Sequence, residues 1–190
     1  FYTVDLLSSS IPYHFSGSIM PEVITLTGDY GTDAEVRIGK NKAIDGFATF
    51  NGLPFMLKNS AYIVSLDTLF SYNEEEGPNI TLQHLQVEKD NPDSSVNPRL
   101  EISGSGTKYG AQINSISYTD LYSSLNGNSD ITINIDGKVF SSAGIQMNLR
   151  DEISDESFVI DASVSNPDLV PLNNETIFTS LYANAMVEIS

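Results

Sequence analysis

Hydrophobic and polar residues alternate along most of the chain, and this spacing predicts β-strands. Residues 130–135 alternate Asp, Ile, Thr, Ile, Asn and Ile, and the hairpin dipeptide Asp136-Gly137 follows them. A longer run, from Ile177 to Ile189, keeps its apolar residues at every second position. Each such strand has one face to bury and one face for solvent. The pattern predicts an all-β chain.

The first half of the chain has shorter expected strands, over residues 2–7, 22–27, 35–38, 46–50, 55–57, 62–70, 80–87 and 100–103. In the strand over 80–87 the apolar parity changes between Leu82 and Leu85, which predicts a β-bulge. Turn-rich pieces separate the strands, and we interpret residues 90–98 as a long surface loop. We expect one domain over residues 1–190, an immunoglobulin-like or jelly-roll antiparallel sandwich.

One short helix is expected near residues 119–125. Thr119 and Asp120 are residue types that cap helices, and Leu121 and Leu125 lie four positions apart, on one helical face. Asn126-Gly127 follows and is typical of a helix end.

The composition narrows the function classes. The 190 residues include 25 acidic and 9 basic side chains, a formal net charge of −16. This balance argues against nucleic-acid binding, which needs positive charge against phosphate. No stretch approaches the roughly 18 apolar residues of a membrane span. The start, Phe1-Tyr2-Thr3-Val4, lacks an initiator Met, so we expect a processed, secreted or cell-surface protein.

Catalytic chemistry has little support in the sequence. The chain has no cysteine, and His14 and His84, its two histidines, carry no catalytic signature around them. We therefore expect no enzyme and nominate no catalytic residue, with a glycosidase or lyase as the minor alternative. Acidic turns offer the weak metal candidates Asp90, Asp93, Asp151 and Asp155. Their spacing is not that of an EF-hand, so solvated turns are favoured and calcium is the one cofactor considered.

The last third resembles the major pilins of chaperone–usher fimbriae, in particular the cysteine-free class 5 and common-pilus subunits. The resemblance covers about 80 residues. It lies in the Thr119-Asp120-Leu121 turn, the alternating hairpin 131–142 and the small-apolar run 181–189. It implies a structural subunit of an extracellular filament that polymerises by β-strand complementation and supports adhesion. The partners would be further copies of itself or other surface subunits.

In that resemblance, an N-terminal segment over residues 1–8 would be the donor strand, with Tyr2, Val4 and Leu6 as the donor positions. The wall of the acceptor groove would be Leu181, Ala183, Ala185, Val187 and Ile189. The alternation around Tyr2 breaks at Ser8-Ser9-Ser10, which departs from the pilin pattern. The alternative interpretation is a monomeric ligand-binding β module for calcium, a glycan or a small hydrophobic molecule.

Overall fold

The computed structural model describes residues 2–8, 11–57, 60–90, 96–169 and 182–189. Within these residues the chain forms thirteen β-strands and one 3-10 turn, η1 (Lys40–Lys42). The strands are β1 (Tyr2–Ser8), β2 (Ile11–Ile19), β3 (Val23–Gly28), β4 (Thr32–Ile38), β5 (Ile44–Leu57), β6 (Ser60–Asn73), β7 (Gly77–Asp90), β8 (Arg99–Thr107), β9 (Gly110–Thr119), β10 (Ser124–Asp136), β11 (Val139–Asp151), β12 (Glu156–Ser165) and β13 (Tyr182–Ile189). The prediction of an all-β chain is confirmed.

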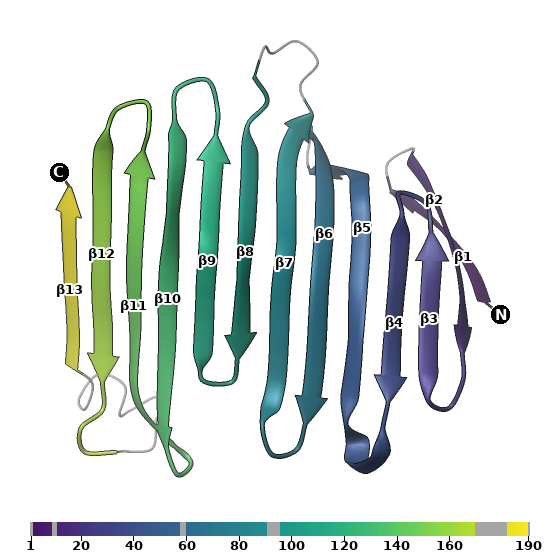
Figure 1. Ribbon diagram of the computed structural model, residues 1–190, viewed down its shortest axis with the longest axis horizontal. Coiled ribbons are helices and arrows are strands. Elements are labelled where there is room, and N and C mark those ends of the chain that lie inside the picture. Colours follow the sequence, from purple (N-terminus) through teal and green to yellow (C-terminus); the bar gives the residue numbers. More distant parts are fainter. Residues whose placement is uncertain (1, 9–10, 58–59, 91–95, 170–181, 190) are drawn as a thin grey trace.

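All the described strands belong to one sheet. They follow one another in sequence order from β1 to β13, and each neighbouring pair is antiparallel, so the two ends of the chain lie at opposite edges (Figure 1). The expected sandwich of two packed sheets is therefore corrected to a single layer. The alternation of apolar and polar residues indicates that one face of each strand is to be covered. It does not indicate whether a second sheet or something else covers that face.

The helix expected near 119–125 is also wrong. Residues 120–123 form the turn between β9 and β10, where the Asp120 N–H donates to the Ser123 carbonyl at 2.9 Å. Asp120 Oδ1 accepts from the N–H groups of Tyr122 (2.7 Å) and Ser123 (2.8 Å). An aspartate accepts such bonds in a tight turn as readily as at a helix start. Leu125 lies in β10, while Leu121 is 56% exposed in the turn.

Several finer features of the strands follow the sequence. The register of β7 shifts between Leu82 and Leu85 against β8, so the predicted bulge is confirmed. Asp136 ends β10 and Val139 begins β11, as the Asp136-Gly137 turn predicts. The strands expected over 46–50 and 55–57 are one strand, β5, with a register shift between Phe50 and Leu53. The expected loop over 90–98 falls between β7 and β8, with 91–95 outside the described residues.

The described part of the molecule has almost no enclosed core. Tyr13, 6% exposed, is its one buried hydrophobic residue. The chain exposes 12643 Å² to solvent. A compact protein of 20.7 kDa exposes about 8,900 Å². The excess of roughly 3,700 Å² fits a chain whose described strands form one layer.

Candidate functional site

One face of the sheet is apolar from β2 to β13. Residues that pair across neighbouring strands share a face, so the register defines rows that cross the sheet. One row contains no polar side chain and consists of Ile19, Ile24, Val36, Gly46, Phe70, Ile80, Gly106, Ala111, Ile131, Ile145, Ala162 and Ala185. A second row, from β5 to β13, is Phe50, Leu66, Leu85, Ile102, Ile116, Gly127, Leu149, Phe158 and Ile189.

A third row between these two has hydroxyls at two positions and no charge. It consists of Gly17, Leu26, Ala34, Ala48, Thr68, Leu82, Gly104, Ile113, Ser129, Met147, Ile160 and Val187. We call the side of the sheet that carries the three rows the apolar face. The bulge in β7 keeps Ile80, Leu82, Leu85 and Val87 on this same face.

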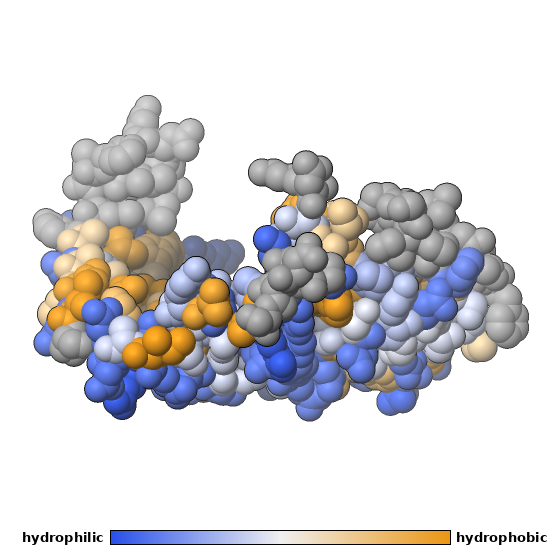
Figure 2. All heavy atoms as spheres, turned by 90° about the horizontal axis from the view of Figure 1, so that it is seen from above, coloured by the Kyte–Doolittle hydropathy of each residue, from blue (hydrophilic) through white to orange (hydrophobic). Residues whose placement is uncertain are grey.

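No described element covers the apolar face. All strand pairs in substantial contact are sheet neighbours, so no described strand packs across another. Ile80 is 51% exposed and Val187 is 63% exposed. In Figure 2, which looks along the strands, hydrophilic residues dominate the lower border and much of the hydrophobic colour lies above them. Among the described residues the apolar face is therefore an open surface, far larger than the few hundred Å² that monomers usually expose.

Glycines bend the sheet toward its apolar face. Gly17, Gly46, Gly104 and Gly127 all lie in the three rows, and a Cβ at any of them would overlap a backbone carbonyl oxygen of the next strand. Missing side chains on one face let neighbouring strands fold toward that face. The Tyr13 hydroxyl in β2 reaches the Pro54 carbonyl in β5, across two intervening strands, which fits this curvature. From these contacts we infer that the apolar face is the concave side of the sheet, and we call it the trough.

Small residues hollow the C-terminal end of the trough. A depression of about 490 Å³ lies over β10 to β13. Its lining includes Ala143, Ala162, Ala183 and Ala185, with Ile131 and Ile145 beside them. Its volume is within the range of small-molecule sites. Large side chains at those alanine positions would fill it.

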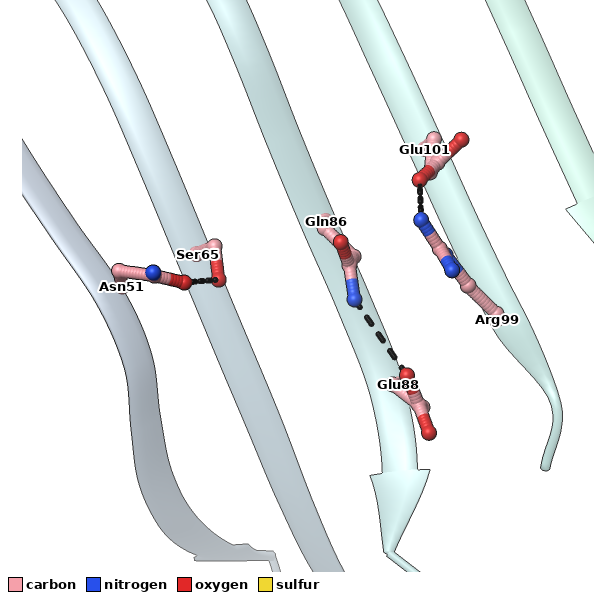
Figure 3. A network of polar contacts seen from close by, with 6 residues as sticks. All are labelled: Asn51, Ser65, Gln86, Glu88, Arg99 and Glu101. Atoms are coloured by element: carbon pink, nitrogen blue, oxygen red, sulfur yellow. Dashed lines mark hydrogen bonds and ion pairs between the residues drawn. The ribbon is translucent and has the colours of Figure 1, made fainter.

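The opposite face carries the polar residues. Figure 3 shows three of its contacts, Asn51 with Ser65, Gln86 with Glu88, and Arg99 with Glu101. A shallow depression of about 560 Å³ there is lined by Glu88, Val96, Asn97, Arg99, Glu101, Ser117 and Thr119. These side chains largely bond one another, as in the Asn97 Nδ2 to Glu88 Oε1 contact of 3.1 Å. This face is a polar surface whose side chains bond one another.

The residues predicted for strand complementation lie at opposite edges of the sheet. Tyr2, Val4 and Leu6 belong to β1, which pairs with β2 of the same chain, Val4 opposite Phe15. Ala183, Ala185, Val187 and Ile189 share the apolar face of β13, while Leu181 lies outside the described residues. The two sets are therefore not brought together within one chain.

The predicted metal residues do not form one site in the described part of the chain. Asp90 is exposed at the end of β7, and Asp93 lies outside the described residues. Asp151, 8% exposed, accepts backbone N–H bonds from Ser124 (3.1 Å) and Ile153 (3.0 Å) through Oδ1. Asp155 instead pairs with Arg150 at 2.5 Å. Among the described residues no group of three or more His, Cys, Asp and Glu side chains could hold a metal ion.

Two turn aspartates have perturbed acidity. Backbone bonds from Ile153 and Ser124 lower the pKa of Asp151, and the bond from Tyr122 does most to lower the pKa of Asp120. Tyr118 donates its hydroxyl to Asp120 Oδ2 at 2.7 Å, and this bond raises the pKa of Tyr118. Each of these carboxylates is engaged in holding a turn, which accounts for the shifts without a catalytic role.

The histidines lie on exposed positions of β2 (His14) and β7 (His84), well separated in the sheet order.

No family model, curated protein or solved structure matches this chain. Within the described residues, no helix has the length and apolar character needed to cross a membrane. The trough therefore remains the feature with the clearest physical consequence.

Proposed function

We propose that this protein is a non-enzymatic binding module that holds the hydrocarbon chains of lipid-like molecules in its trough. The observation that carries the proposal is the set of three rows without a charged residue, which cross up to twelve strands on the concave side of the sheet. Covering such a surface lowers the free energy by removing apolar area from water, and the surface offers almost no hydrogen-bonding groups to direct the binding. Hydrocarbon chains have the same property.

The shape of the trough favours flexible chains over a second copy of this protein. Two identical concave faces placed against each other would touch at their rims and leave a gap between them, because close packing needs complementary shapes. Acyl chains adapt to a curved floor. The length also suits them, since the eleven spacings of about 4.8 Å between β2 and β13 give a trough of about 53 Å.

Charge separates this binding from attachment to an anionic membrane surface. The net charge of −16 repels an anionic surface. The polar face, with acidic residues such as Glu88, Glu101 and Asp161, keeps the loaded protein in water. We infer a carrier or holder of individual lipid molecules. Assembly into a filament and a secreted or cell-surface location stay predictions.

Fluorescent fatty-acid binding tests the proposal. We expect cis-parinaric acid to bind the purified chain, and palmitate and lysophosphatidylcholine to displace it, while glucose does not. Mass spectrometry of protein purified without detergent should show co-purified lipids. Absence of probe binding by a folded chain, with no bound lipid, would refute the proposal.

Variants localise the binding. Ala162→Phe fills the alanine-lined depression without adding charge, and Ile145→Glu puts a carboxylate in the central row. Both should weaken binding by at least about tenfold. The matched control is Asn148→Glu, three residues along β11 on the polar face, where it faces Asn128 and Val159, and it should bind as the parent does. Circular dichroism checks that each variant keeps its strands, and equal loss of binding in the control would contradict the assignment to the trough.

A further inference from the structure

The outer edge of β13 has no partner strand among the described residues, because β13 pairs with β12 alone. Its eight residues contain one charge, Glu188, and no proline. Met186 is 55% exposed and Ile189 is 64% exposed. Soluble proteins usually protect such an edge with charges, proline or a covering segment. Among the described residues, this edge shows none of these devices beyond Glu188.

The number of strands decides which strand of a second copy fits this edge. With thirteen strands and antiparallel neighbours throughout, β1 and β13 run in the same direction. A second copy added in the same orientation would place its β1 parallel to β13. A second copy related by a two-fold axis through the sheet instead places its own β13 antiparallel, the geometry of every other pair.

We propose that the outer edge of β13 pairs with β13 of a second copy about a two-fold axis. The rotation leaves the apolar face of both copies on the same side, so the two troughs join into one. Residues that face each other across two antiparallel strands lie on the same face of the sheet. Because neighbouring residues of one strand lie on opposite faces, the two-fold axis must pass through one residue, which then faces the same residue of the second copy. The strand centre lies between Ala185 and Met186, and an axis at Met186 sets Glu188 opposite Asn184 without opposing like charges.

Cysteine scanning tests this register directly, because the chain has no native cysteine. Single cysteines at residues 184 to 187 should form a disulfide-linked dimer under mild oxidation chiefly at the position on the axis, 185 or 186. Gln146→Cys, exposed on the inner strand β11, is the control that should not cross-link. Cross-linking spread evenly over the scan, or as strong in the control, would overturn the proposal.

Sedimentation measures the association in solution. Met186→Lys places two positive charges against each other at the proposed axis, on the polar face, and should raise the dimer dissociation constant by at least about tenfold. The matched control, Gln146→Lys, puts the same charge on an inner strand and should leave it unchanged. A parent chain that stays monomeric at all concentrations overturns the proposal. So does a dimer that survives Met186→Lys but is lost with Ile145→Glu, since that dimer would form through the trough.

Discussion

At the scale of single residues, two glycines in β8 test whether close approach of strands bends the sheet. Gly104 and Gly106 both lie on the apolar face, but a Cβ at Gly104 would overlap the Gln112 carbonyl oxygen, whereas at Gly106 its nearest neighbours are 3.9 Å away. We expect Gly104→Ala to lower the free energy of unfolding by about 1–3 kcal/mol. Gly106→Ala should be neutral or stabilise by up to about 1 kcal/mol. Urea unfolding of both variants measures this, and equal effects would argue against the bend.

Two aspartates should make stability depend on pH. The pKa values of Asp120 and Asp151 are lower in the folded chain than the ordinary value of 3.8, because turn N–H groups bond their carboxylates. Their contribution is complete above the unfolded-state pKa and is lost as pH falls through the lower folded-state pKa. We expect Asp151→Asn to flatten the loss of stability below about pH 4. Urea midpoints at several pH values, with Asp136→Asn as the exposed control, measure the change, and parallel curves for both variants would contradict it.

At the scale of strands, the sequence predicts much of what the structure contains. Alternation located β7 and part of β10, and the change of parity between Leu82 and Leu85 located a bulge. The helix near Leu121 was wrong because Asp120 bonds the same N–H groups in a turn as it would at a helix start. The two hydrophobic pieces of β5 looked separate because Gly52, with φ of 70°, interrupts the pattern between them.

The bulge in β7 gives a prediction for the whole element. Against β6, His84 pairs with Asp67 and Leu82 pairs with Thr68, so Gln83 is the extra residue. Deleting Gln83 would leave Ile80, Leu82, Leu85 and Val87 in simple alternation, so we expect a folded chain that loses less than about 1 kcal/mol. Deleting Gln86 instead would turn one end of β7 over and should cost several times more. Thermal unfolding compares the two, and a Gln83 deletion as harmful as the Gln86 deletion would contradict the role of the bulge.

At the scale of the whole molecule, the sequence could not reveal that the chain forms one layer. Ile131, Ile145 and Ala162 have the same alternation in a sheet that faces a second sheet and in a sheet that faces a ligand. What covers an apolar face is decided by chain topology, and the described strands follow one another from β1 to β13 without any of them packing across the sheet. The trough follows from that topology together with the glycines on its concave side.

The single layer predicts an extended molecule in solution. A sheet of thirteen strands, about 58 Å wide and one layer thick, has a radius of gyration of about 20 Å, against about 16 Å for a compact chain of this length. Small-angle X-ray scattering of the Met186→Lys variant, which we expect to be monomeric, measures this value. Adding palmitate should change it little, because chains that fill the trough do not alter its outline. A value near about 16 Å before addition would mean that the free sheet closes over its apolar face, and the open trough would then be the form that exists only with a bound lipid.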